Sequence, residues 1–274
     1  MNGRELSAAL HKGGPVYGTL VVSASPRWPS VIGDSGLDFV FIDTEHVAID
    51  REPLSWMCQV YRQLNIAPLV RIPEPNPNLA TMALDGGATG IIAPYVETAE
   101  QVKSLVGAVK CRPLKGRRLQ ELLDGKAVEP VLRRYIDRRN SQNVLIVNVE
   151  SEPAVEALDE ILSVPGLDGV LIGPHDLSCS LGVPEQYDHP KFEATVQDII
   201  QRARSAGVGA GIHFWGDLQQ EIHWLQSGLN MLIHSGDITL LAKHLRSELD
   251  TIKAGLSADH NHRPTLHKPH QVFI

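Results

Sequence analysis

Two acidic residues, Glu150 and Asp176, follow two neighbouring apolar runs in the segment 143–178. The runs VLIVNVE and DGVLIGPHD have the composition of buried strands, and the helical stretch between them makes the segment a βαβ unit. Adjacent parallel strands end at the same edge of a sheet, so the two acids are expected to lie close together. Hard divalent cations bind carboxylate oxygens and leave positions open to water and substrate. Each acid could instead stabilise a helix N-terminus, but the pair, with the Gly173–Pro174 turn between them, favours a metal site.

Polar residues at other predicted strand ends could act on a substrate. His46 follows the run FVFID together with Asp43 and Glu45, and a histidine beside carboxylates has the composition of a positioned general acid or base. Arg71 stands in the apolar run PLVRI, where a buried guanidinium needs an anion. That anion is either a carboxylate of the chain, such as Asp85, or a carboxylate or enolate oxygen of a substrate.

Eight strand-like runs, from 16–22 to 230–235, alternate with helical stretches along the chain. This alternation predicts an α/β fold with a parallel sheet, and 274 residues is close to the size of a (β/α)8 TIM barrel. In such a barrel the carboxyl ends of all strands converge on one mouth. The barrel would therefore gather the residues above into one site.

Two segments do not follow this alternation of strands and helices. The stretch at about 112–142 is polar, rich in Arg and without a strand pattern, and it is predicted to be a βα insertion over the active-site face. The barrel domain is expected to span 1–256. The C-terminal tail, 257–274, carries four histidines whose spacings match no regular ligand pattern, so a poorly ordered tail is expected rather than a metal site.

The composition argues against several kinds of partner. The net charge is −7 and no dense Lys/Arg stripe is present to replace counterions, so nucleic acid is not expected as a partner. No apolar run approaches 18 residues and the N-terminus has no apolar signal region, so neither a membrane span nor secretion is expected and a cytoplasmic protein is predicted. The three cysteines are far apart, as free thiols in a reducing compartment would be.

Five segments, in order along most of the barrel, resemble the HpcH/HpaI family of metal-dependent pyruvate aldolases. This family includes 4-hydroxy-2-oxoheptanedioate aldolase and 2-dehydro-3-deoxyglucarate aldolase and is related to the citrate lyase beta subunit. The segments are GLDFVFIDTEH (36–46), PLVRIPEPNP (68–77), LDGGATGIIAPYVETAEQ (84–101), NVLIVNVES (143–151) and GLDGVLIGPHDLSCSLG (166–182).

The resemblance implies a phosphoenolpyruvate/pyruvate-type barrel with a divalent metal ion, Mg, Mn or Co, as cofactor. Glu150 and Asp176 would bind the ion, and Arg71 would hold the oxygens of the 2-oxo acid. His46 would act as the base through water, with Asp43 and Asp85 supporting it. The expected catalytic residues are His46, Arg71, Asp43 and Asp85, and the expected substrate-binding residues are Arg71, Asn148, Gly173, Pro174 and His175. The resemblance also implies a homo-oligomer, a hexamer or trimer of dimers that exchange the last helix, 238–252. Packing of that helix on its own barrel is the alternative.

Three positions depart from the family pattern. Asn148 stands where the family usually has Gln, and its side chain is one methylene shorter. The sequence RPLKGRRLQ replaces the glycine-rich PRGxRG loop, retaining Arg117 and Arg118 but losing the flexible glycines, which puts aldehyde recognition there in doubt. His175 occupies a position that is often small, where it could narrow the pocket, carry a proton or point away.

The leading hypothesis is a class II aldolase, a carbon–carbon lyase that splits a 4-hydroxy-2-oxo acid into an aldehyde and pyruvate or an analogue such as hydroxypyruvate. No predicted strand end carries a lysine, which argues against aldolases that form a Schiff base. One alternative is an acyl-CoA lyase of the malyl- or citryl-CoA type, for which Arg112, Lys115, Arg117 and Arg118 could supply charge. A second alternative is a barrel without turnover that serves as a binding or regulatory subunit.

Overall fold

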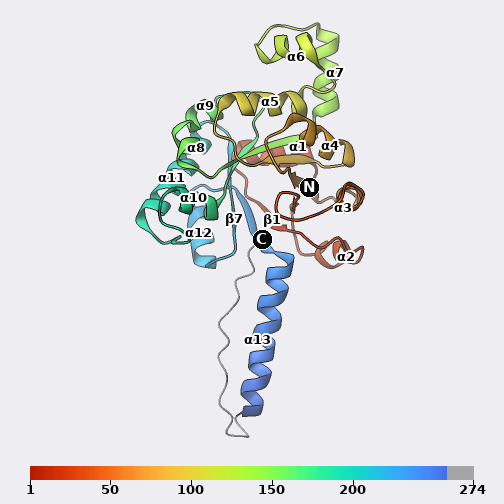
Figure 1. The fold of residues 1–274 in the computed structure, drawn as a ribbon. Helices are drawn as coiled ribbons and strands as arrows, with labels where there is room; N and C mark the ends of the chain where they lie inside the picture. The colour runs from red at the N-terminus through yellow and green to blue at the C-terminus, as the bar shows by residue number, and fades with distance from the viewer. Residues whose placement is uncertain (258–274) are drawn as a thin grey trace.

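In the computed structural model, which describes residues 1–257, eight parallel strands form a closed barrel in which β1 is hydrogen-bonded to β8 (Figure 1). The strands are β1 (Val16–Leu20), β2 (Phe39–Asp43), β3 (Ala67–Arg71), β4 (Gly90–Ala93), β5 (Val144–Val149), β6 (Gly169–Ile172), β7 (Gly209–Phe214) and β8 (Met231–Gly236). The helices that follow them around the barrel are α2 (Trp28–Ile32), α3 (Arg51–Gln63), α4 (Pro77–Gly86), α5 (Ala99–Lys110), α8 (Glu152–Glu156), α9 (Leu158–Leu162), α10 (Pro174–Ser180), α11 (Pro190–Ser205), α12 (Leu218–Gln226) and α13 (Asp237–Ser257). The predicted (β/α)8 barrel is confirmed.

Alternating strand residues divide the apolar core into two layers, because successive side chains of a strand point to opposite faces. Inward-facing residues such as Phe41, Leu69 and Ile233 fill the barrel interior. Their outward-facing neighbours, such as Val70 and Leu232, pack under the surrounding helices. This alternation decides which residue at each strand end points into the mouth.

Helix α1 (Gly3–Lys12) closes the amino-terminal end of the barrel. Its Leu6 and Leu10 are fully buried against the interior layer. Below them, the buried carboxylate of Asp168 accepts a hydrogen bond from Ser7 Oγ at 2.6 Å and pairs with Lys110 Nζ at 2.5 Å and His11 Nε2 at 3.2 Å. This network connects α1 to β6 and α5, at the end of the barrel away from the mouth.

We expect the docking of α1 to depend on pH. The hydrogen bond to Asp168 raises the pKa of His11, although burial opposes the shift. Because the folded pKa lies above the unfolded value of about 6.5, the stabilisation is fully present below about pH 6.5 and is lost as the pH rises through the folded pKa. A series of Tm measurements from pH 6 to pH 8.5 should therefore fall more steeply for the wild type than for His11→Gln. Parallel curves would contradict this role.

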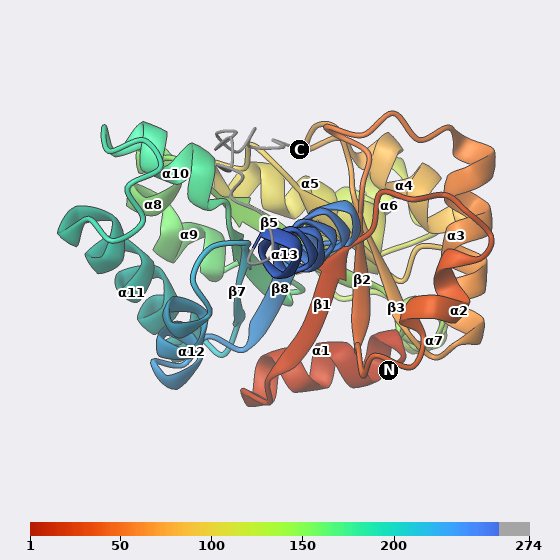
Figure 2. The same cartoon turned by 90° about the horizontal axis from the view of Figure 1, so that it is seen from below.

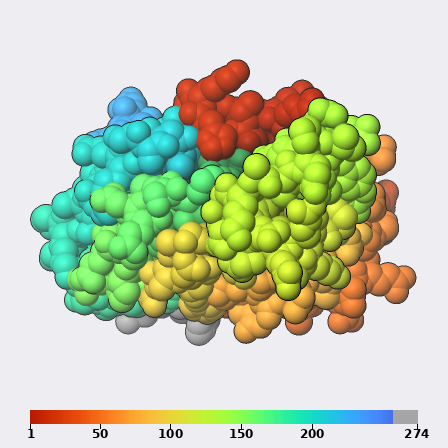
Figure 3. Space-filling model, turned by 90° about the horizontal axis from the view of Figure 1, so that it is seen from above, coloured from red at the N-terminus to blue at the C-terminus, as the bar shows by residue number. Residues whose placement is uncertain are grey.

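The position predicted for the insertion at 112–142 is wrong. It contains α6 (Gly116–Leu123) and α7 (Pro130–Asn140) and lies between α5 and β5, so it is an αβ and not a βα connection. It packs on the outside of the barrel over α4 and α5, on the opposite side from the projecting helix α13 (Figure 1), and forms one face together with the N-terminal segment (Figure 3). The mouth of the barrel is not covered by it.

Helix α13 projects away from its own barrel (Figures 1 and 2). Its apolar stripe is solvent-exposed, with Leu245 51% and Ile252 58% accessible. The outer side of β1, where an eighth helix would lie, is also open, and Tyr17 there is 43% exposed. Own-barrel packing of the last helix is therefore wrong for this chain as described.

No helix within residues 1–257 combines the length and apolar character needed to cross a membrane. The predicted tail, 257–274, lies outside the described residues except for Ser257.

Candidate active site

The polar residues of the mouth occupy the next inward position after the apolar interior. On five strands, the residue two places after an inward-facing core residue also faces inward and lies at the mouth. Four of these residues carry polar side chains, and the fifth is a glycine, which leaves space for its neighbours. The pairs are Phe41 and Asp43, Leu69 and Arg71, Ile146 and Asn148, Leu171 and Gly173, and Gly211 and His213. A single periodicity thus builds both the core and the site.

A cavity of about 470 Å3 opens at this mouth. Most of the predicted site residues line it, namely His46, Arg71, Asn148, Glu150, Gly173, Pro174, His175 and Asp176, together with Phe41, Leu171, Ile172, His213 and Trp215. The barrel therefore brings both predicted metal ligands, the arginine and the histidine into one space.

Arg71 is fixed by carboxylates of β2 and the loop after it. Its Nε donates to Asp43 Oδ1 at 2.9 Å and its Nη2 donates to Asp43 Oδ2 at 2.6 Å, while Glu45 Oε2 lies 3.1 Å from Nε. The guanidinium also lies 5.2 Å from the centre of the Phe41 ring. Burial alone would raise the pKa of Asp43, but the hydrogen bonds and charge of Arg71 outweigh it and the pKa lies below its usual range. Asp43, and not Asp85, is therefore the internal anion, and Nη1 has no hydrogen-bond partner among residues 1–257.

Glu150 is held in one orientation from both sides. Its Oε1 accepts a hydrogen bond from the backbone N–H of Tyr95 at 2.8 Å, and its Oε2 accepts one from Asn148 Nδ2 at 2.7 Å. A Cβ at Gly173 would come within 2.7 Å of Oε2, so only glycine leaves room for this carboxylate. Burial raises the pKa of Glu150, and the charges of Asp176 and Glu45 add to the effect. Carboxylates that lie close together disfavour one another's charged form. A cation bound between them would stabilise the charged forms.

The donor set matches the oxygen preference of a hard divalent cation. Besides Glu150 and Asp176, Asn148 contributes an amide oxygen, Oδ1, that is buried and has no hydrogen-bond partner among residues 1–257. A buried acceptor without a donor is costly unless something else satisfies it. No group of three or more His, Cys, Asp or Glu side chains with the arrangement of a metal site occurs in the described part of the chain. An ion here would therefore have two carboxylates, leaving positions for water and substrate.

The two predicted histidines lie at the rim. The His46 side chain is 44% exposed and its Nε2 lies 3.7 Å from Glu45 Oε1, beyond hydrogen-bond distance. Asp43 pairs with Arg71, and among the described residues Glu45 is the only carboxylate within 4.0 Å of this imidazole. His175 lies with its Nδ1 3.7 Å from Glu185 Oε1 on the opposite rim. Asp43 was predicted to support His46, but it holds Arg71 instead.

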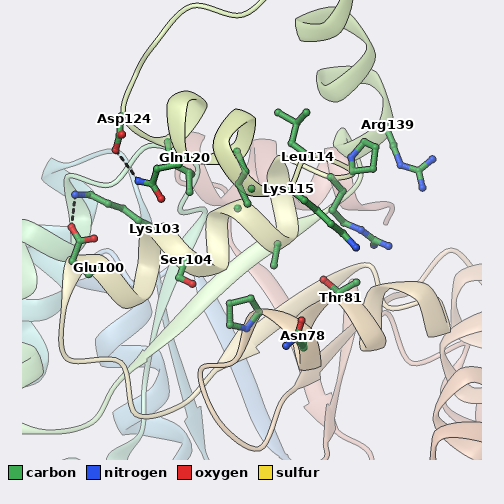
Figure 4. Close-up of a pocket in the computed structure, with 18 of the residues that line it drawn as sticks. Asn78, Thr81, Glu100, Lys103, Ser104, Leu114, Lys115, Gln120, Asp124 and Arg139 are labelled. Atoms are coloured by element: carbon green, nitrogen blue, oxygen red, sulfur yellow. Dashed lines mark hydrogen bonds and ion pairs between the residues drawn. The ribbon is translucent and has the colours of Figure 1, made fainter.

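Asp85 is the one predicted site residue that the chain places elsewhere. It lies at the end of α4, is exposed, pairs with Arg112 of the insertion and lines a different cavity of about 730 Å3. This larger cavity lies between α4, α5 and the insertion on the outside of the barrel (Figure 4). Asp85 is close to Arg71 in the sequence, but helix α4 lies between them and carries Asp85 away from the mouth.

Five residues of the cavity were not among the predicted site residues, and two of them, His213 and Trp215, carry ring nitrogens that could contact a ligand. The strand-like run VGAGIHF contained the signal, since His213 follows Gly211 on the inward face. The Tyr95 backbone contact has no such signal, because it depends on a φ of +53° that is rare outside glycine and asparagine.

A closed parallel barrel whose strand ends gather carboxylates, an arginine and a histidine in one mouth defines a TIM-barrel enzyme of the kind that acts on anionic small molecules. The family model for HpcH/HpaI aldolase/citrate lyase matches residues 17–243, and the chain belongs to this family.

Individual relatives agree with this assignment. A hydroxypyruvate/pyruvate aldolase from Roseovarius nubinhibens is 34% identical over 88% of this chain and 94% of its own length. A 2-keto-3-deoxy-L-rhamnonate aldolase from Escherichia coli is 33% identical over 90% of this chain and 92% of its own length. The crystal structure of an HpcH/HpaI aldolase from Desulfitobacterium hafniense superposes with a TM-score of 0.79, with 30% identity over 90% of this chain and 96% of that one. The family resemblance of the sequence motifs is therefore confirmed.

Proposed function

We propose that the protein is a metal-dependent, class II aldolase. It cleaves or forms the C3–C4 bond of a 4-hydroxy-2-oxo acid, giving an aldehyde and pyruvate or an analogue such as hydroxypyruvate. The observation that carries the proposal is the gathering of Arg71, Asn148, Glu150, Asp176 and His46 around one cavity of about 470 Å3. The two relatives described above are a hydroxypyruvate/pyruvate aldolase and a 2-keto-3-deoxy-L-rhamnonate aldolase, which supports an aldolase activity.

Each residue has a task in the cleavage direction. His46 takes the proton of the C4 hydroxyl, so that the C4 oxygen becomes the aldehyde carbonyl as the C3–C4 bond breaks. The bonding electrons pass into the 2-oxo acid fragment as an enolate, and Arg71 donates hydrogen bonds to the developing oxyanion. The proton that His46 has taken then passes to C3 through water, which gives the 2-oxo acid product and restores the neutral imidazole. Asp43 keeps the guanidinium in place throughout.

Glu150 and Asp176 would hold the divalent ion, and Mg, Mn and Co are the candidates for it. When bound, the ion supplies positive charge that polarises the keto oxygen. Asn148 orients Glu150 through its Nδ2, and its free Oδ1 is available to a water or substrate hydroxyl.

The direct test is a screen of 2-oxo acids paired with aldehydes, with Mg, Mn or Co added after chelator treatment. We expect carbon–carbon bond formation with at least one pair, dependent on added metal. Turnover that survives chelation unchanged would contradict the metal requirement, and no turnover with any pair would contradict the aldolase proposal.

An acyl-CoA lyase gains no support from the placement of the basic residues. Arg112, Lys115, Arg117 and Arg118 belong to the insertion on the outside of the barrel, and none of them lines the mouth cavity. They could not guide a CoA tail into this mouth within one chain.

We further infer a homo-oligomer in which α13 is exchanged between subunits. The exposed leucine stripe of α13 and the exposed Tyr17 on the outer side of β1 are apolar groups that one chain leaves uncovered, and a second copy of the chain could cover them. We also propose that the protein is cytoplasmic, as the sequence predicts.

Light scattering at micromolar concentration should give a multiple of the 30.0 kDa chain mass for the wild type. Leu245→Glu should lower that mass, because it places a carboxylate in the apolar stripe. Ser247→Glu is the matched control, since two helical residues later the side chain points to the opposite face. A monomeric wild type, or equal effects of the two changes, would contradict the exchange.

A further inference from the structure

His213 is the last inward-facing residue of β7 and lines the candidate catalytic cavity. Its ring packs edge-on against two aromatic side chains, Phe41 at 5.4 Å and Trp215 at 5.3 Å between ring centres. Arg71 lies over the same Phe41 ring, 5.2 Å from its centre. The guanidinium and the imidazole thus both lie against the same Phe41 ring.

The hydrogen bond of His213 determines which ring nitrogen carries the proton. Nε2 lies 3.0 Å from the backbone carbonyl oxygen of Ser235. A carbonyl can only accept, so Nε2 is protonated and Nδ1 holds a free lone pair. Ser235 has a φ of +52°, a left-handed conformation uncommon for serine, at the strand end where its carbonyl meets His213. The backbone therefore adopts an unfavourable conformation where it fixes this tautomer.

Nδ1 has no hydrogen-bond partner among residues 1–257, and it is not one of the polar atoms sealed from solvent. Burial lowers the pKa of His213 to about 4, so the ring stays neutral at physiological pH. The nitrogen that remains open is therefore an acceptor and does not become a donor between about pH 5 and pH 9.

We propose that His213 is a specificity-determining residue, whose Nδ1 accepts a hydrogen bond from a substrate hydroxyl on C3 or C4 while Arg71 holds the 2-oxo acid. This rests on the proposed function, in which the 2-oxo acid binds at Arg71. A neutral acceptor favours a hydroxyl, which can donate, over a carboxylate, which cannot. The aromatic faces of Phe41 and Trp215 would pack against the C–H groups of the same carbon chain.

The test uses two ligand pairs that differ by one hydroxyl. Pyruvate and hydroxypyruvate differ at C3, and 2-oxopentanoate and 4-hydroxy-2-oxopentanoate differ at C4. Stopped-flow tryptophan fluorescence with Mg present reports binding within milliseconds, before turnover, because Trp215 adjoins His213. Trp215→Phe identifies the part of the signal that comes from this residue.

In the wild type, the hydroxylated member of at least one pair should bind about three- to tenfold more tightly, the effect of one net hydrogen bond. His213→Leu should remove that preference and leave the affinity for the partner without the hydroxyl within about twofold. His213→Gln, which keeps an acceptor, should retain part of it. A Tm measurement on each variant shows that the binding data come from folded protein.

Equal binding within both pairs of the wild type, or a preference that survives His213→Leu, would overturn the assignment. Selective binding without cleavage of any 4-hydroxy-2-oxo acid would refute the aldolase proposal and support the role of His213. Failure of every 2-oxo acid to bind would refute both.

Discussion

Glu150→Gln and Asp176→Asn should each lower carbon–carbon bond cleavage by at least about 100-fold at a fixed, subsaturating concentration of Mg or Mn. A hard cation depends on carboxylate charge, and an amide of the same shape supplies only a dipole. In Glu150→Gln the shape is kept, but Asn148 Nδ2 and Tyr95 N–H both donate to the present carboxylate, so the amide N–H2 would face a donor on one side. Both steady-state rates and calorimetric titration with Mn should report the loss.

The matched control for Glu150→Gln is Glu152→Gln, two residues later in the chain. Glu152 lies on α8, is exposed and pairs with Lys191 at 3.0 Å, away from the cavity. It should keep wild-type rates and metal affinity. Full activity of both Glu150→Gln and Asp176→Asn in chelator-treated buffer without added metal would refute the metal site.

Stability should move differently from activity in Glu150→Gln. Burial and the neighbouring Asp176 and Glu45 raise the pKa of Glu150, so its charged form is unfavourable when no cation is bound. Removing that charge should leave the Tm of the metal-free protein unchanged or higher. Added Mg should raise the Tm of the wild type and not of Glu150→Gln, because a ligand stabilises only the state that binds it.

The barrel and the mouth were predictable because both follow from strand periodicity. Buried strands are short apolar runs, and the residue that continues the inward alternation past the run falls at the mouth. Arg71 and Glu150 were predicted from their positions at the ends of apolar runs, and the inward alternation explains why their side chains meet at the mouth. His213 obeys the same rule and could have been found with it.

Other features depend on where chain segments meet in space. Asp85 was expected in the site as a possible anion for Arg71 and as a catalytic residue implied by the family resemblance, yet α4 carries it to the outside of the barrel, where Arg112 pairs with it. The insertion was assigned to the mouth from its length and polarity, but its position after α5 decides which connection it extends. Whether an acidic residue pairs with Arg71 or His46 is likewise set by side-chain reach, and only three-dimensional placement distinguishes Asp43 from Asp85.

Arg71→Lys should leave the barrel folded and reduce kcat by about 10²- to 10³-fold, the effect of losing a preorganised donor at an oxyanion. The guanidinium uses Nε and Nη2 to hold Asp43 and has Nη1 for the substrate, whereas one ammonium cannot occupy both positions. The lysine is expected to stay with the buried Asp43 carboxylate, because leaving that charge unpaired would be costly. The enolate oxygen would then lose its donor where charge develops, so kcat should fall more than KM for the keto acid rises.

Asp43→Asn separates the two tasks of Arg71. It keeps the guanidinium but removes the charge that orients it, so we expect a smaller loss of kcat than in Arg71→Lys, together with a lower Tm. If Arg71 served only to pair with Asp43, Arg71→Lys would show the opposite pattern, a lower Tm with nearly normal kcat in the folded fraction. Measuring Tm and kcat on the same preparations of both variants distinguishes these cases, because a structural ion pair affects stability first and a substrate-binding arginine affects turnover first.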